Sequence, residues 1–158
     1  MTLIPALPDS LQSIQSSPLF TLALDITAVQ RISSDTIVGV VGGGRFEGSR
    51  LSGRVLEGGS DWQRVMPDGS VRLDCRIVLE TAESELIAMT YQGVRAGPAE
   101  VLARLAQGAD VRADEYYQRI APLFRTQSPQ RAWLNGIIAV GTGMRLPTGP
   151  IYNVFEVR

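Results

Sequence analysis

The sequence has no His and no Lys, and it has a single Cys among its 158 residues. Without His, catalytic sites of the Ser-His-Asp and Cys-His types are excluded, and so are imidazole ligands for a metal. Without Lys, a Schiff base and a complete Walker loop are excluded. Acid–base chemistry would therefore have to use carboxylates, tyrosines or the thiol of Cys75. We expect neither a metal nor a cofactor.

An excess of charge of either sign is also missing, because fifteen Arg face sixteen Asp and Glu. No basic run marks a nucleic-acid-binding surface. No apolar run approaches the roughly 18 residues of a membrane helix. The first residues carry no positive charge, and Pro5 and Pro8 interrupt their apolar stretch, which is not typical of a secretory signal. A single Cys suits a reducing compartment. We therefore expect a cytoplasmic protein that binds neither nucleic acid nor membrane.

The length fits one domain, which we place at residues 18–158 after an N-terminal arm at residues 1–17. The clearest strand pattern lies in residues 70–81, where apolar side chains alternate with polar ones. Residues 86–94 read as the second strand of a hairpin. A helix is predicted over residues 98–107, since Gly108 stands where a C-terminal cap belongs. Further strands are expected at 19–29, 36–41, 51–56, 61–66, 114–124, 131–141 and 151–157, with a loop at 144–150.

Many short strands and one helix that does not alternate with them indicate an all-β, mainly antiparallel fold. Such a chain forms a sandwich or a closed barrel, and we favour the barrel with one inserted helix. The charged face of residues 70–81 carries Asp74 and Arg76. This face either lines a cavity inside the barrel or faces solvent, as one face of an antiparallel sheet often does.

Two features have structural rather than catalytic interpretations. The run Gly42–Gly48 lacks the Lys-Ser/Thr of a Walker loop and the third Gly of a dinucleotide fingerprint, so we interpret it as a bulged turn between strands. Cys75 shares its face of the strand with Leu73 and Ile77, whereas Arg76 points the other way. Cys75 is therefore expected to be a core side chain rather than a reactive thiol.

Several polar and aromatic residues could furnish a site. Taken singly, each is more often structural, but together they suit a small-molecule pocket with aromatic walls. The clusters are Asp61 with Trp62, Asp74 with Arg76, Tyr91 with Arg95, Tyr116 and Tyr117 with Arg119, and Trp133 with Asn135.

An ordered series of motifs resembles the domain of unknown function 3237 family over residues 18–158. The matching stretches are Gly43-Gly44-Arg45-Phe46-Glu47-Gly48, Leu51-x-Gly53-x-Val55-Leu56, Gly58-Gly59-Ser60-Asp61-Trp62, Pro67-Asp68-Gly69, Leu73-Asp74-Cys75-Arg76, Tyr91-x-Gly93-x-Arg95, Glu115-Tyr116-Tyr117-x-Arg119, Trp133-Leu134-Asn135 and Tyr152-x-Val154-Phe155. The resemblance implies a small lipocalin-like antiparallel β-barrel. It also implies a pocket formed by Asp61, Trp62, Asp74, Arg76, Tyr91, Arg95, Tyr117, Trp133 and Asn135.

Three hypotheses follow. The first is a cofactor-independent enzyme that moves protons on a small carbonyl or aromatic metabolite, in an isomerisation, a cyclisation or an addition–elimination. Its base would be Asp61 or Asp74, its acid Tyr91 or Tyr117, and its oxyanion donor Arg76, Arg95 or Asn135, with Trp62 and Trp133 binding the substrate. The second is a carrier for a small organic anion, and the third is a purely structural polar network. A homodimer, formed through an open edge or the apolar last strand, is also expected.

Overall fold

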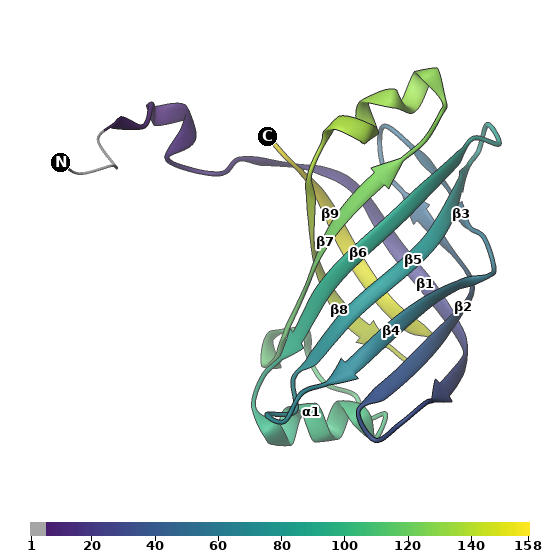
Figure 1. Ribbon diagram of the computed structural model, residues 1–158, viewed down its shortest axis with the longest axis vertical. Helices are drawn as coiled ribbons and strands as arrows, with labels where there is room; N and C mark the ends of the chain where they lie inside the picture. Colours follow the sequence, from purple (N-terminus) through teal and green to yellow (C-terminus); the bar gives the residue numbers. More distant parts are fainter. Residues whose placement is uncertain (1–5) are drawn as a thin grey trace.

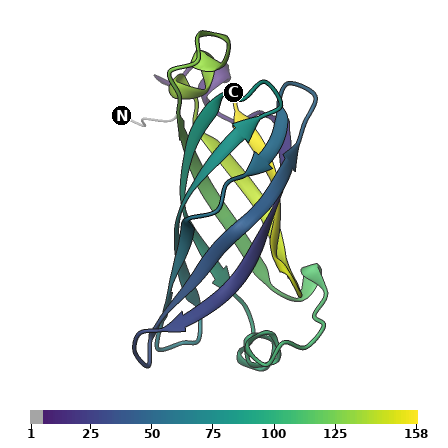
Figure 2. The same cartoon turned by 90° about the vertical axis from the view of Figure 1, so that its right-hand side faces the viewer.

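The computed structural model describes residues 6–158 and shows a barrel of strands with a short helix at one end (Figures 1 and 2). The strands are β1 Ser16–Arg31, β2 Thr36–Glu47, β3 Ser52–Val55, β4 Gly59–Val65, β5 Val71–Thr81, β6 Leu86–Ala96, β7 Tyr117–Arg125, β8 Ala139–Leu146 and β9 Gly149–Val157. The α-helix is α1 Ala99–Ala106, and 3-10 helices lie at η2 Asp9–Leu11, η3 Ala113–Glu115 and η4 Pro129–Gly136.

The strands close into an antiparallel barrel, as the sequence predicts. Their order is β1-β9-β8-β7-β6-β5-β3-β2-β4, and β1 also pairs with β2, which completes the ring. The short strands β3 and β4 share one position between β2 and β5, so the barrel has eight positions. Strand β9 is paired on both sides, with β1 and β8, so it offers no free edge to a second copy. A homodimer stays a prediction, but pairing of two copies through a free edge of the last strand no longer supports it.

The apolar side chains of β5 point into the barrel and form part of its core. Burial alternates along the whole strand, and the thiol of Cys75 lies among the buried apolar side chains. This confirms the expectation that Cys75 is a core residue. Burial also raises the pKa of the thiol, because a thiolate would lose its hydration there. The sulfur therefore contributes packing rather than nucleophilic chemistry.

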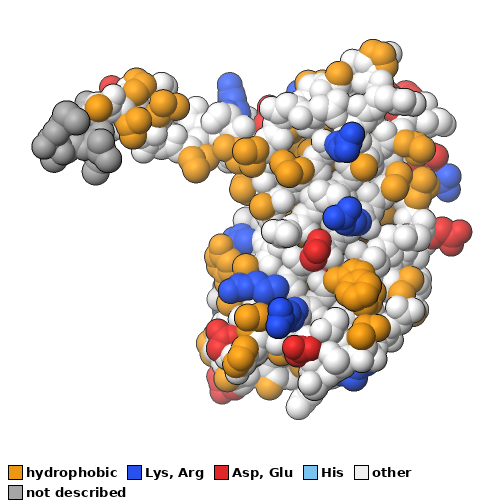
Figure 3. Space-filling model, viewed as in Figure 1, with side chains coloured by type: hydrophobic (Ala, Val, Ile, Leu, Met, Phe, Trp, Pro, Cys, Tyr) orange, Lys and Arg blue, Asp and Glu red, His pale blue; other side chains and the backbone are white. Residues whose placement is uncertain are grey.

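The charged face of β5 lies outside the barrel, so the solvent-facing alternative is correct, and the pocket position that the family resemblance implies for Asp74 and Arg76 is wrong. Arg72, Asp74 and Arg76 are all exposed. Figure 3 shows charged side chains of both signs beside apolar ones on the side of the molecule that faces the viewer in Figure 1. The physical reason is the two-residue period of a strand: once Leu73 and Cys75 point into the core, their neighbours must point away from it.

The glycine run lies inside strand β2 rather than in a turn between two strands. Residues 36–41 of β2 pair with β4, and residues 44–47 pair with β3, so the run lies where β2 changes partners. Gly44 has φ of +143°, and a Cβ there would come within 2.2 Å of the carbonyl oxygen of Ala23. The run therefore allows a sharp bend within a continuous strand, where we had expected a break.

The segment predicted as a strand at 131–141 folds differently. The 3-10 helix η4 covers its first half, and β8 begins only at Ala139. Pro129 is one cause, since its fixed φ suits the first position of a helical turn. The expected loop at 144–150 is instead a tight turn between β8 and β9. Strand β1 begins at Ser16, two residues before the expected domain start, and residues 1–5 of the expected arm lie outside the described residues.

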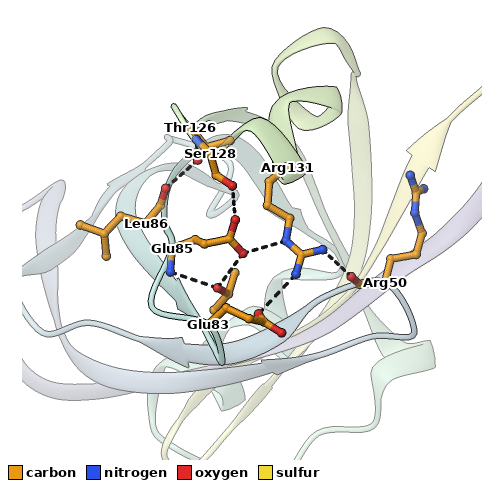
Figure 4. Close-up of polar contacts among 8 residues, drawn as sticks. Arg50, Glu83, Glu85, Leu86, Thr126, Ser128 and Arg131 are labelled. Atoms are coloured by element: carbon orange, nitrogen blue, oxygen red, sulfur yellow. Dashed lines mark hydrogen bonds and ion pairs between the residues drawn. The ribbon is translucent and has the colours of Figure 1, made fainter.

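The two ends of the barrel are covered by different elements. At one end, η4 is held to the β5–β6 turn by Arg131, whose Nε and Nη2 donate to Glu85 at 3.1 Å and to Glu83 at 3.3 Å (Figure 4). The Ser128 hydroxyl also donates to Glu85. Helix α1 lies at the opposite end (Figure 1), and it buries Leu102 and other apolar side chains. No helix in residues 6–158 is long and apolar enough to cross a membrane.

Candidate functional site

A cavity of about 420 Å³ opens at the end of the barrel where α1 lies. Its volume is within the range of roughly 300–1,000 Å³ that is common for small-molecule sites. Side chains from the ends of β1, β2, β4, β5 and β6, from α1, and from the β8–β9 turn line it. The polar lining residues are Arg31, Asp61, Gln63, Arg95, Arg145 and Thr148, and the apolar ones include Ile26, Ile37, Val65, Val71, Leu102 and Leu146.

Asp61 on β4 is the only carboxylate among these lining residues, and it is 2% exposed. Gln63 donates a hydrogen bond of 3.0 Å from its Nε2 to Oδ2 of Asp61. The other oxygen, Oδ1, is buried and has no hydrogen-bond partner in residues 6–158. Burial raises the pKa of this carboxyl, and this effect outweighs the lowering by Gln63 and Arg95. Asp61 therefore supplies the cavity lining with a carboxyl group that holds its proton more tightly than an exposed aspartate and has one buried oxygen without a partner.

Tyr91 lies in the same row of the barrel as Asp61, with Cys75 between them. Asp61 pairs in register with Cys75 across β4 and β5, and Cys75 pairs with Tyr91 across β5 and β6. The Tyr91 hydroxyl is buried and, within the described chain, it too has no hydrogen-bond partner. Burial holds the pKa of Tyr91 well above its ordinary value, so the hydroxyl stays protonated and is available as a donor.

Arg95 on β6 is held by a short chain of hydrogen bonds. Its Nε donates to Oε1 of Gln118 at 3.2 Å, and Nε2 of Gln118 donates to the hydroxyl of Tyr152 at 2.9 Å. Arg95 is 7% exposed, and in the described part of the chain no carboxylate forms an ion pair with it. Burial lowers the pKa of its guanidinium, and the nearby charge of Arg145 lowers it further. A positively charged donor thus lines the same cavity as Asp61.

Of the nine residues predicted for the pocket, the structure brings Asp61, Tyr91 and Arg95 together. Four others lie on the outside of the barrel: Trp62, Asp74, Arg76 and Tyr117. Trp62 follows Asp61 directly in β4, so the two side chains must point to opposite faces. The same rule applies to Tyr117, which precedes the buried Gln118. Their placement in the cavity was therefore wrong.

Trp133 and Asn135 lie at the opposite end of the barrel, on η4. The guanidinium of Arg50 stacks 3.6 Å above the centroid of the Trp133 ring. Asn135 accepts a hydrogen bond from the amide of Thr126 at 2.8 Å and donates one to its carbonyl at 2.9 Å. Both side chains fasten η4 to its neighbours, so the structure contradicts their predicted place in the pocket.

Four residues of this region were missed by the sequence analysis: Gln63, Gln118, Arg145 and Tyr152. Two of them had a usable signal. Gln63 is two residues from Asp61 and so shares its face, and Gln118 shares the face of the apolar Ile120. No comparable signal marks Arg145, because it reaches the cavity only through the pairing of β8 with β7 and β9 in the closed barrel.

A second hollow lies on the outer surface of β4, β5, β6 and β7, and Trp62, Asp74 and Arg119 are among its lining residues. This hollow has no buried polar atom that lacks a partner, within residues 6–158. Because both such atoms, on Asp61 and Tyr91, belong to the interior, we take the interior cavity as the candidate site.

Comparison with known proteins agrees with the fold and extends over nearly the whole chain. The chain is 30% identical to a UPF0311 protein of Rhodopseudomonas palustris over 150 residues, covering 92% of this chain and 97% of that protein. It is 28% identical to a UPF0311 protein of Clostridium acetobutylicum, with 94% and 97% covered.

Solved structures give the same result. A beta-barrel like protein from Acinetobacter baumannii is 40% identical and superposes with a TM-score of 0.80, covering 92% of this chain and 97% of that one. A conserved protein of unknown function from R. palustris is 27% identical, with a TM-score of 0.89 and 92% and 98% covered. An enzyme from Penicillium herquei is 21% identical with a TM-score of 0.66, covers 96% and 100%, and shares the fold. The family described as "Protein of unknown function (DUF3237)" matches residues 14–157, and the chain belongs to this family.

Proposed function

We propose that this barrel binds a small carbonyl or aromatic metabolite in the cavity beside α1 and moves a proton on it without a cofactor. The observation that carries the proposal is the buried carboxyl of Asp61, which lines the cavity and has a free oxygen atom. A buried polar atom without a partner is costly, so such an atom beside a cavity is best explained by a ligand that satisfies it. The eight-position barrel is also of a size that, as in lipocalin-type barrels, holds one small ligand.

In this proposal Asp61 is the base. Its carboxylate takes a proton from a carbon next to a carbonyl group, or from a phenolic hydroxyl, and the electron pair left behind becomes an enolate or phenolate. Its raised pKa makes Asp61 a stronger base than an exposed aspartate. Returning the same proton to another carbon of the enolate completes an isomerisation. In an addition, the enolate or phenolate first forms a bond to the β-carbon of an activated double bond, the π electrons move onto the activating carbonyl group, and the proton is then returned to the carbon of the new enolate. No oxidant or reductant is needed.

Arg95 would hold the negative charge that develops on the oxygen of the substrate. A guanidinium does not lose its proton at neutral pH, so it can donate hydrogen bonds but cannot act as the base. Its Nε already bonds to Gln118, which fixes its orientation before a ligand arrives. Asp61 and Arg95 thus divide the work of moving a proton and stabilising a charge.

Tyr91 is the proposed proton donor for a group that reaches below the cavity. It is not among the residues that line the cavity, but it lies in the row of Asp61, and its hydroxyl lacks a partner. Asp74 and Tyr117, the alternative base and acid in the sequence analysis, lie on the outer surface. They have no role in this proposal.

The alternative function is that of a carrier for a small organic anion, and one observation favours it. Arg95 and Arg145 both line the cavity, and among the described residues neither is ion-paired. The same charges would hold an anion without chemistry. A carrier would bind its ligand and return it unchanged.

The test compares Asp61→Asn with Asp74→Asn, a matched change on the outer surface. Enones, β-keto acids and phenols are incubated with each protein in deuterated buffer, and turnover and deuterium uptake at carbon are followed by NMR. We expect Asp61→Asn to slow turnover by about 100-fold or more, which is the usual contribution of a general base. Asp74→Asn should behave as the parent protein does.

Two results would contradict the enzyme. One is full activity of Asp61→Asn, which would show that Asp61 is not the base. The other is tight binding of several compounds by the parent protein with no turnover or deuterium exchange, which would favour the carrier.

A further inference from the structure

We infer that Arg95 and Arg145 form an anion-binding subsite in the cavity, and that its ligand is an organic anion with an apolar body. This inference rests on the proposed small-molecule binding, and it specifies the chemical class of the ligand. It holds for an enzyme and for a carrier alike, so its test is separate from the test of catalysis.

The first argument is the charge of the cavity. Three arginines, Arg31, Arg95 and Arg145, line it against the single carboxylate of Asp61. In residues 6–158, none of these four side chains forms an ion pair. Arg31 and Arg145 are exposed, whereas Arg95 is buried, and a buried charge is normally paired because the loss of its hydration is otherwise uncompensated. The lining therefore carries a positive charge that an anion would balance.

The second argument is that Arg95 and Arg145 repel each other. The charge of Arg145 is the largest influence on the pKa of Arg95 after burial, and it acts to lower it. Both arginines line the same cavity, and in residues 6–158 no carboxylate forms an ion pair with either. One carboxylate, phenolate or enolate placed near both would turn this repulsion into two favourable contacts.

The third argument is that the guanidinium of Arg95 and the backbone of Arg145 are both fixed before any ligand binds. Arg95 is held through Gln118, which in turn donates to Tyr152. The backbone amide of Arg145 donates to the hydroxyl of Tyr116 at 2.8 Å, and Tyr116 packs in the apolar cluster of α1. Prior anchoring reduces the entropy that is lost on binding.

The rest of the lining gives the ligand its second property. Leu102 and Ala106 of α1 face apolar side chains from several strands, including Ile26, Ile37 and Val71. A fully polar anion would leave this surface in contact with water, whereas a ring or an alkyl chain would cover it. We therefore specify an amphipathic anion, with its charge at Arg95 and Arg145 and its body against α1.

The experiment uses matched compounds on three carbon frames: propionate, benzoate and 2-naphthoate, each beside its neutral amide and its primary amine. Binding to the full chain is measured by calorimetry. On at least one frame we expect the carboxylate to bind about tenfold or more tightly than the amide, which corresponds to about 1.4 kcal/mol. The amine should bind more weakly than either.

Arg145→Gln should remove most of this preference for the carboxylate over the amide. Arg145→Gln is the key variant because the Arg145 side chain is exposed, so the change should not disturb the core. The hydrogen bond from its backbone amide to the hydroxyl of Tyr116 is also retained. Arg95→Gln should have a larger effect if it folds. Arg72→Gln, the same change on the outer face of β5, is the control and should leave the preference intact.

The inference is overturned if amides bind as tightly as carboxylates, if the preference survives Arg145→Gln, or if no carboxylate binds on any frame. A failure of catalysis looks different. If carboxylates bind with the expected preference and no compound is turned over, the subsite stands and the proposed enzyme falls.

Discussion

Asp61 and Tyr91 flank Cys75 in one row across β4, β5 and β6, and each has a buried oxygen atom without a hydrogen-bond partner in residues 6–158. Neighbouring strands are about 4.8 Å apart, so the row places a proton acceptor and a proton donor about two strand spacings from each other. The buried thiol of Cys75 lies between the two groups. This row defines the position at which we expect chemistry, and the predictions below test its parts.

The raised pKa of Asp61 makes a prediction about stability and pH. Because the folded state holds this proton more tightly than the unfolded state, Asp61 stabilises the fold below its ordinary pKa of 3.8, and that contribution is lost as the pH rises through the higher folded-state pKa. The free energy of unfolding of the parent protein should therefore fall relative to that of Asp61→Asn as the pH rises from about 4 towards neutrality. Urea unfolding at a series of pH values measures the difference. A difference that is independent of pH, like the one expected for Asp74→Asn, would contradict the prediction.

The two buried tyrosines should respond differently to loss of the hydroxyl. Tyr152→Phe removes the acceptor of a bond from Gln118 and leaves that buried amide unsatisfied, which we expect to cost about 1–3 kcal/mol. Tyr91→Phe removes a hydroxyl that has no partner, so it should be neutral or stabilising. Chemical denaturation of both variants makes the comparison. Equal losses would show that the Tyr91 hydroxyl is bonded in solution.

The thiol of Cys75 should be inert in the native protein. It is fully buried, and burial raises its pKa, so both access and thiolate are lacking. Ellman's reagent should react within the folded protein only at the rate of unfolding, and promptly in denaturant. Arg72→Cys, made together with Cys75→Ala, provides an exposed thiol on the same strand as the control. Rapid labelling of native Cys75 would show that the barrel opens there.

The contacts of Arg131 should stabilise the end of the barrel that lies away from α1 (Figure 4). Arg131 bonds to Glu83, to Glu85 and to the carbonyl of Arg50. Arg131→Ala should therefore lower the free energy of unfolding more than Arg54→Ala, whose ion pair with Glu80 is largely exposed and adds at most about 1 kcal/mol. Hydrogen exchange of η4 should rise in the first variant only. Equal effects of the two changes would mean that this network is not a structural fastening.

The contribution of Glu85 to this network also depends on pH. The hydrogen bond from Ser128, with further bonds from Arg131 and Thr81, holds the pKa of Glu85 below its ordinary value. This contribution to stability is present above the ordinary pKa of a glutamate and is lost as the pH falls through the lower folded-state value. It therefore acts in the opposite direction to that of Asp61. Glu85→Gln should reduce the loss of stability that the parent protein shows as the pH falls through the folded-state pKa of Glu85. Asp61→Asn should instead remove the gain in stability that Asp61 contributes as the pH falls.

Much of the fold is readable from the residues. The strict alternation in β5 predicts a strand with one apolar face, and the spacing of apolar residues before Gly108 predicts α1. The exclusion of imidazole and lysine chemistry also needs no structure. Asp61, Tyr91 and Arg95 are predicted as site residues from the sequence. Asp61 and Arg95 line the cavity, and Tyr91 is buried in the barrel. Each of them occurs at an inward position of its own strand.

The error at Asp74 and Arg76 arises because the local pattern does not say which face of a strand becomes the inside. The charged face of β5 and the apolar face are equally regular, and only the closing of the sheet shows that Asp74 and Arg76 lie outside. Trp133 and Asn135 were misplaced because Pro129 starts a 3-10 helix at the far end of the barrel.

By itself, therefore, the sequence determined the all-β class, the helix and the limits on the chemistry, because these depend on composition and on the period of side chains along one strand. Only the tertiary structure decided where the site lies. Closure of β1 onto β2 and β9, and the place of β8 in the ring, which brings Arg145 into the same cavity lining as Arg95, join residues that are far apart in the chain. Long-range pairing of this kind sets which side chains share an interior, and no local pattern encodes it.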